Sequence, residues 1–138
     1  MENKIDVAVK GIIIYDNKVL IIQRSADDEF GANTWECVGG KIDFGEELED
    51  ALIREVNEEV GLIIAVDKLL YAATFKTNEH RQVVILTYSC TAHCNTVKLS
   101  EEHQRYMWAN KEQMMSLLPK SITDDIDCNA AWDYIFPE

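Results

Sequence analysis

Residues 40–62, GKIDFGEELEDALIREVNEEVGL, are the most informative stretch of this chain. Three glutamates, Glu55, Glu58 and Glu59, lie close together within it. The spacing of the apolar residues predicts one helix over residues 46–60. Carboxylates grouped on one helix either repel each other in solvent or hold a cation, so their positions on the helix decide the interpretation.

The apolar residues of the expected helix form one stripe, made of Leu48, Leu52, Val56 and Val60, with Ala51 at its edge. Because each residue turns the side-chain direction by about 100°, Glu55 and Glu59 point along or beside this stripe. Glu58 lies one step outside it, and Arg54 faces the opposite, solvent side. Burial of two unpaired carboxylates is costly, whereas hard divalent cations bind oxygen ligands of this kind. The pattern therefore predicts a metal site on the inward helix face.

The alternative is that these acids form a solvated patch on an amphipathic helix. The residues that flank the helix argue against this alternative. Gly39, Gly40 and Gly45 surround a short loop before the helix, and Gly61 follows its last turn as an expected C′ cap. Glycines at these places are typical of a backbone that turns sharply or approaches a ligand closely.

The same stretch fits the Nudix box: Gly, five residues, Glu, seven residues, Arg-Glu, an apolar residue, any residue, Glu-Glu, any residue, Gly and an apolar residue. Every position with a restricted residue type is met, by Gly40, Glu46, Arg54, Glu55, Val56, Glu58, Glu59, Gly61 and Leu62. The chain therefore resembles the MutT-like branch of the Nudix hydrolases. The resemblance implies an α/β (α+β) fold, the Nudix α/β/α sandwich with a mixed β-sheet.

The resemblance also implies roles for residues of the box. The carbonyl of Gly40 and the carboxylates of Glu55, Glu58 and Glu59 would bind Mg²⁺ or Mn²⁺, and Glu55 or Glu58 would act as, or orient, the base that activates water. Arg54 would orient a glutamate, and helical spacing leaves Glu47 and Glu58 as its partners. Glu46 is left open between a structural role in the first turn and a role as ligand.

Outside the box, the resemblance marks Glu102, and after it Glu101, as an extra metal ligand or catalytic base in the loop before residues 106–109. Arg24, at the end of the second expected strand, would contact phosphate of the bound nucleotide. The alternatives are an exposed loop acid and a solvated arginine. Trp108 would either stack on a base or pack in the core, and the core is preferred.

The implied function is metal-dependent hydrolysis of a nucleoside diphosphate linked to another group. The preferred reaction cuts a nucleoside triphosphate, with an oxidised nucleotide such as 8-oxo-dGTP as one candidate, to monophosphate and pyrophosphate. ADP-ribose, dinucleoside polyphosphates and nucleotide sugars are alternative substrates. Two further candidate functions are a non-catalytic nucleotide sensor and an isomerase of isopentenyl-diphosphate type. Val38 stands where many MutT-like chains have proline, which leaves the subfamily open.

Length and composition agree with a small-molecule enzyme. A chain of 138 residues predicts a single domain over residues 1–138. With 13 basic and 25 acidic residues, the net charge of −12 argues against binding of a nucleic-acid polymer, and a metal would reduce the repulsion of a nucleotide. No apolar run approaches the ~20 residues of a membrane span, so we expect no membrane association and a cytoplasmic protein. Exposed strands could support a homodimer, although nothing requires one.

Four cysteines, Cys37, Cys90, Cys94 and Cys128, form no CxxC pair and are expected to be reduced thiols. The alternative of a zinc site at residues 90–94 is disfavoured, because Cys90 falls in an expected strand. Alternation and turn residues predict the remaining elements, with Asp16 and Asn17 as the turn of a hairpin between the first two strands. Strands are expected at residues 7–15, 19–23, 34–38, 68–76, 83–92 and 106–109, and helices at residues 111–118 and 123–136, the last with Thr123 as N-cap.

Overall fold

The computed structural model describes residues 2–138 and contains seven strands and four helices in this range. The elements in chain order are β1 (Lys4–Tyr15), β2 (Lys18–Arg24), β3 (Trp35–Glu36), β4 (Val38–Lys41), α1 (Leu48–Val60), β5 (Ile64–Asn78), β6 (Arg81–Ala92), β7 (His103–Ala109), α2 (Lys111–Leu117), α3 (Lys120–Cys128) and α4 (Trp132–Ile135). Strands and helices alternate unevenly along the chain, as the expected α+β class requires.

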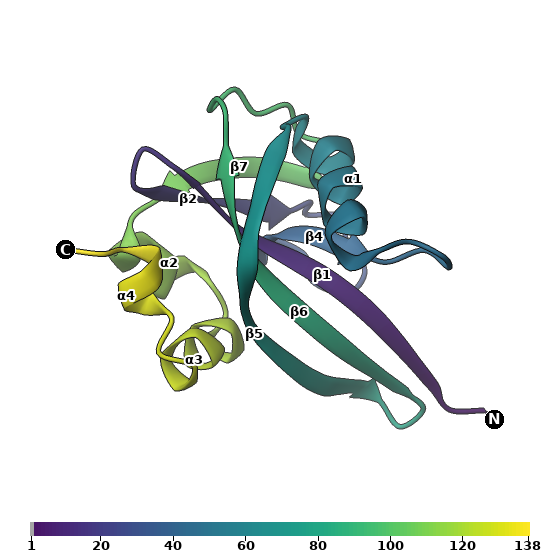
Figure 1. The fold of residues 1–138 in the computed structure, drawn as a ribbon. Coiled ribbons are helices and arrows are strands. Elements are labelled where there is room, and N and C mark those ends of the chain that lie inside the picture. The colour runs from purple at the N-terminus through teal and green to yellow at the C-terminus, as the bar shows by residue number, and fades with distance from the viewer. Residues whose placement is uncertain (1) are drawn as a thin grey trace.

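The strands form one mixed sheet in the order β3-β2-β1-β6-β5, with β4 also paired to β1 and β7 paired to β2. β1 pairs with β6 in parallel and with β2 and β4 in antiparallel fashion. Helix α1 lies on one side of the sheet, and α2, α3 and α4 gather on the other (Figure 1). This arrangement confirms the predicted α/β/α sandwich with a mixed sheet.

Each side of the sheet has its own apolar core. The core under α1 contains Val9 and Ile13 of β1 together with Leu52, Val56 and Val60 of the helix. The second core contains buried side chains of β1, β2 and the C-terminal helices, among them Ile12, Ile21, Met114, Ile126 and Trp132. Because side chains alternate along a strand, β1 contributes to both cores and lies at the centre of the fold.

Several local predictions are confirmed. Asp16 and Asn17 join β1 to β2, and both have positive φ, 51° and 60°, as a two-residue hairpin turn of type I′ requires. Gly61 ends α1 in the left-handed conformation with φ 71°, as predicted for a C′ cap. Helix α2 ends one residue before the predicted boundary and begins with a capping box built by Asn110 and Gln113.

Some boundaries were wrong. α1 begins at Leu48 rather than at Glu46, and β5 is longer at both ends than the expected strand over residues 68–76. Three register shifts between β5 and β6 explain the second error, because each bulge interrupts the alternation on which the prediction relied. The expected strand over residues 34–38 is divided between β3 and β4.

The last predicted helix, residues 123–136, was also wrong. It is divided into α3 and α4, and Ala130 between them has a positive φ of 52°. Thr123 lies inside α3 and is buried, and its hydroxyl donates to the carbonyl of Lys120, so it is not the N-cap. The break turns α4 so that Trp132 stacks on Phe136 and packs into the second core.

Within the described residues, no helix combines the length and the apolar character needed to cross a membrane. The four cysteines carry free thiols; Cys37 and Cys90 are buried, and Cys94 and Cys128 are exposed.

Candidate functional site

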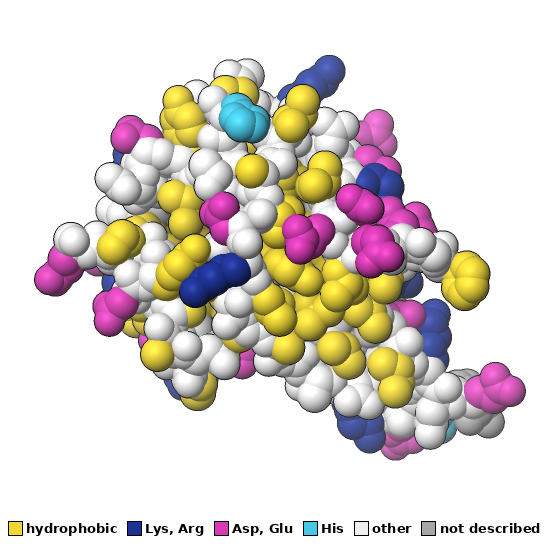
Figure 2. Space-filling model, in the orientation of Figure 1, with side chains coloured by type: hydrophobic (Ala, Val, Ile, Leu, Met, Phe, Trp, Pro, Cys, Tyr) yellow, Lys and Arg dark blue, Asp and Glu magenta, His cyan; other side chains and the backbone are white. Residues whose placement is uncertain are grey.

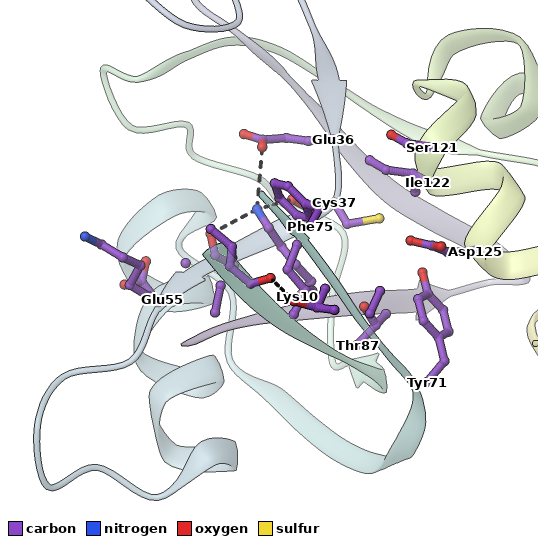
Figure 3. Close-up of a pocket in the computed structure, with 18 of the residues that line it drawn as sticks. Lys10, Glu36, Cys37, Glu55, Tyr71, Phe75, Thr87, Ser121, Ile122 and Asp125 are labelled. Carbon is purple, nitrogen blue, oxygen red and sulfur yellow. Dashed lines mark hydrogen bonds and ion pairs between the residues drawn. The ribbon is translucent and has the colours of Figure 1, made fainter. Parts of the chain in front are cut away.

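A pocket of about 1000 Å³ extends from the acidic face of α1 to helix α3. Its floor is the face of β1, β6 and β5 that carries Ala8 and Lys10, and Glu55 lies at one end, with Tyr71 and Asp125 at the other (Figure 3). The pocket therefore joins the predicted metal helix to a region of the molecule that the sequence had not connected with it.

Strand register explains the shape of this floor. Lys10 is paired with Gly39 of β4 and with Thr87 of β6, and Thr87 is paired with Tyr71 of β5. Paired residues project their side chains to the same face of a sheet, so Lys10, Thr87 and Tyr71 form one row across the floor. The next row contains Ala8, whose small side chain keeps the floor low beside Lys10.

Glu59 is the most deeply buried acid of α1, with 9% of its surface exposed. Its Oε1 accepts a hydrogen bond of 3.0 Å from the backbone N–H of Gly39. Burial raises the pKa of Glu59 to about 7, even though the charge of Lys10 and the hydrogen bond from Gly39 act in the opposite direction. The helical wheel had placed this side chain beside the buried stripe, and the structure agrees.

His103 of β7 lies next to Glu59, with its Nδ1 at 3.6 Å from Glu59 Oε2. Its Nε2 lies 2.7 Å from Glu36 Oε2, a contact in which the ring nitrogen donates. In the neutral ring Nδ1 is then an acceptor, and it is buried without a hydrogen-bond partner among the described residues. With a neutral ring and an ionised Glu59, two acceptors, Nδ1 and the Glu59 carboxylate, thus face each other with no donor between them.

Glu102 completes this cluster. One ligand atom from each of Glu59, Glu102 and His103 lies within 4.8 Å of the others. Carboxylate oxygens and an imidazole nitrogen at such distances are a donor set that divalent cations accept. A cation at this point would give Nδ1 a partner and would stabilise the ionised form of Glu59, which burial disfavours. The residues therefore fit a cation.

Glu55 lies one turn before Glu59 on α1 and faces the same pocket. A Cβ added to Gly40 would lie only 2.6 Å from Glu55 Oε2, so the missing side chain of Gly40 leaves the room that this carboxylate occupies. Both residues line the pocket. The carbonyl of Gly40 and the carboxylates of Glu55 and Glu59 can therefore contribute oxygen ligands on this side of the pocket.

Arg54 contacts the acidic side chains from the solvent side of the pocket. Its guanidinium donates to Glu46 at 2.8 and 2.9 Å, to Glu55 at 3.1 Å and to Glu58 at 3.2 Å. The hydrogen bond from Arg54 lowers the pKa of Glu46 to about 2. The first partner of Arg54 is therefore Glu46, which the sequence had not offered, and Arg54 is half-buried rather than fully solvent-facing.

Glu58 differs from Glu55 and Glu59, because its side chain is 58% exposed and does not line the pocket. It remains linked to Glu55 through Arg54. On the face shown in Figure 2, acidic side chains gather over α1, and Lys and Arg side chains are sparse there.

Glu36, which the sequence did not single out, lies on the far side of His103 from Glu59. Burial alone would raise the pKa of Glu36, but the hydrogen bond from His103 and the charges of Lys10 and Arg24 outweigh it and hold the pKa at about 2. Arg24 lies 3.2 Å from Glu36 and 2.8 Å from Asp28, so it lines the pocket as an ion-paired side chain.

The sequence contains only weak indications that His103 and Lys10 belong to the site. His103 directly follows Glu102, and Lys10 is a charge within an otherwise apolar strand, but neither pattern indicates a partner. Trp108 packs against Tyr15 with ring centroids 5.8 Å apart and does not line the pocket, which agrees with the preferred core role.

Comparison with known proteins shows which protein family this chain matches. The family model of the NUDIX domain matches residues 5–128. The curated relatives include nucleoside triphosphatase NudI from Escherichia coli O17:K52:H18, 27% identical over 114 residues that cover 75% of this chain and 81% of the relative. They also include CTP pyrophosphohydrolase from Escherichia coli K12, 30% identical over 107 residues that cover 78% of this chain and 77% of the relative.

Solved structures agree over a larger part of the chain. The MutT protein from Methanosarcina mazei Go1 superposes with a TM-score of 0.83 at 25% identity, and the match covers 94% of this chain and 96% of that one. The ORF135 protein of E. coli gives a TM-score of 0.77 at 25% identity, with 98% and 95% of the two chains covered.

Proposed function

This chain belongs to the Nudix family of hydrolases, and on that premise we propose that it converts nucleoside triphosphates to monophosphate and pyrophosphate with the help of Mg²⁺ or Mn²⁺. The observation that carries the metal dependence is the pair of acceptors at Glu59 and His103, which face each other without a donor. The two relatives named as a nucleoside triphosphatase and a CTP pyrophosphohydrolase support the triphosphate substrate.

The shape of the pocket supports one orientation of the nucleotide. The phosphates lie at the α1 end, where Gly40, Glu55 and Glu59 offer ligands for a cation that binds phosphate. The nucleoside then lies toward α3, where Tyr71 and Asp125 line the pocket. Arg24 lines this path, and to contact phosphate it would have to exchange its ion pair with Asp28 or Glu36.

Each acidic residue has a distinct role in this proposal. A bound divalent cation would neutralise phosphate charge and lower the pKa of bound water. Glu55 lies in the pocket and is the better placed of the two candidate bases, while Arg54 restricts its orientation from the outer side. Glu58 acts through Arg54, and Glu102 adds a carboxylate beside Glu59 from the residue that precedes β7.

CTP is the first substrate to test because of the named relative, and 8-oxo-dGTP is the second. ADP-ribose, dinucleoside polyphosphates and nucleotide sugars are the nearest alternatives. The net charge of −12 supports a small nucleotide rather than a nucleic-acid polymer as the partner.

The test measures release of phosphate and pyrophosphate from a panel of these compounds with Mg²⁺, with Mn²⁺ and with chelator. We expect pyrophosphate from a triphosphate only when a divalent cation is present. Cleavage in chelator would contradict the metal dependence. A folded protein that binds nucleotides but cleaves none would favour the function of a nucleotide sensor.

A further inference from the structure

Four cationic side chains among residues 2–138 line the pocket: Lys10, Arg24, Lys41 and Arg81. Arg24 and Arg81 each have a carboxylate partner at 2.8 Å, Asp28 and Asp6. The side chain of Lys41 is 56% exposed, at the rim. Of these four side chains, only Lys10 lies deep in the pocket and, among the described residues, has no carboxylate closer than 3.5 Å.

The contacts of Lys10 are all long. Its ammonium lies 3.5 Å from Glu36 Oε1, 3.3 Å from the carbonyl of Cys37 and 3.4 Å from the carbonyl of Gly39. Charge-assisted hydrogen bonds of an ammonium group usually measure about 2.7–2.9 Å. Only 21% of the side chain is exposed, so water replaces these contacts only in part. The ammonium group is thus weakly held and can donate to an anion in the pocket.

The position of Lys10 on the floor indicates which anion this is. Lys10 is one strand away from Gly39, next to the expected cation site, and two strands away from Tyr71. Strands are spaced by about 4.8 Å, so roughly 10 Å separate Lys10 from the Tyr71 end. That span accommodates a ribose and a base, and the remaining phosphates then fall at Glu55 and Glu59. In Figure 3, Lys10 lies between Glu55 and Tyr71.

We propose that Lys10 binds the α-phosphate of the nucleotide, the phosphate that stays with the nucleoside monophosphate after cleavage. The inference rests on the proposed function, because it assumes a nucleotide whose phosphates point toward α1. On binding, the ammonium group exchanges three long contacts for a short bond to a phosphate oxygen, and its charge offsets part of the repulsion from the acidic pocket.

The experiment compares binding of nucleoside monophosphates and of the corresponding nucleosides, in chelator, by isothermal titration calorimetry. The probes are CMP, UMP, AMP and GMP with cytidine, uridine, adenosine and guanosine. For Lys10→Met we expect the affinity for the monophosphate to fall about 10- to 100-fold, the range for a lost hydrogen bond to a charged group, while nucleoside affinity changes less than about twofold. Lys10→Arg should recover part of the monophosphate affinity.

Lys41→Met is the matched control, because it removes the same charge from the rim of the same pocket. If Lys41→Met weakens monophosphate binding as much as Lys10→Met, the loss reflects the total positive charge of the pocket and not a direct contact with Lys10. The assignment to Lys10 is then overturned. An equal loss for monophosphate and nucleoside in Lys10→Met would indicate a structural role and would also overturn it. Wild-type protein that binds none of the monophosphates would also overturn the proposal for Lys10, whereas the proposed function fails only if no pyrophosphate is released in the presence of a divalent cation.

Discussion

Glu36 and Glu59 lie on opposite sides of the His103 ring, and the two sides of the pocket have opposite effects on the pKa of a carboxylate. Their side chains are similarly buried, 14% and 11% exposed. The pKa of Glu36 is about 2, and that of Glu59 is about 7. Burial acts in the same direction on both, so the difference must come from their partners.

Glu36 has Lys10, Arg24 and a ring nitrogen of His103 around it. Glu59 has one backbone N–H, from Gly39, and the second ring nitrogen, which faces it as an acceptor. Glu36 is therefore held in its charged form by contacts within the protein, whereas Glu59 forms no ion pair with a lysine or arginine among the described residues. We infer that Glu36 organises the site and that Glu59 is left for a cation.

The largest expected effect concerns Glu59→Gln. If Glu59 holds the metal, this change should reduce metal-dependent turnover by about 10³-fold, since a bound metal contributes several kcal/mol to transition-state stabilisation. Steady-state pyrophosphate release measures it. Glu49→Gln, an exposed acid of the same helix, is the control and should leave turnover nearly unchanged. Full activity of Glu59→Gln would remove Glu59 from the ligand set.

The second prediction uses the raised pKa of Glu59 in chelator. An acid whose folded-state pKa, about 7, exceeds the ordinary 4.5 stabilises the fold below pH 4.5 and loses that contribution as the pH rises through 7. The loss is about 3 kcal/mol in the free energy of unfolding. Urea denaturation between pH 5 and 8 should show wild type losing this stability relative to Glu59→Gln. Parallel curves for the two proteins would show that burial of Glu59 has no such effect.

Glu36 should behave in the opposite way. Its folded-state pKa of about 2 lies below 4.5, so its contribution to stability is present above pH 4.5 and is lost as the pH falls toward 2. Between pH 5 and 3, wild type should lose about 2 kcal/mol that Glu36→Gln does not lose. The same denaturation assay at acidic pH measures the difference. A loss in the alkaline rather than the acidic range would invalidate the comparison of the two carboxylates.

The smallest effect is expected for Gly40→Ala. The new Cβ would meet the end of the Glu55 side chain, which can move, so stability should change little while Glu55 is displaced. We expect turnover to fall about 10-fold, the lower end of the loss seen when the support of a metal ligand is disturbed. Thermal unfolding run in parallel checks the fold. A Gly40→Ala enzyme with wild-type turnover would mean that Glu55 has no role at its observed position.

Much of the fold followed from local pattern. The helix that carries Glu55 and Glu59, its glycine cap at Gly61 and the turn at Asp16 and Asn17 were predictable, because periodicity and the φ preferences of turn residues act over a few neighbouring residues. The β5 bulges and the left-handed break at Ala130 were not, because packing against distant elements overrides local preference there.

The same division holds for the candidate site. The sequence by itself determined that Glu55 and Glu59 lie beside the inward face of one helix, and it predicted a cation beside them. Only the tertiary structure decided which residues meet these acids. Lys10, Glu36 and His103 come from β1, β3 and β7, and Glu36 and His103 are 67 residues apart. Contacts of this kind depend on strand register across the sheet, and a one-residue slip of β1 would turn Lys10 to the opposite face.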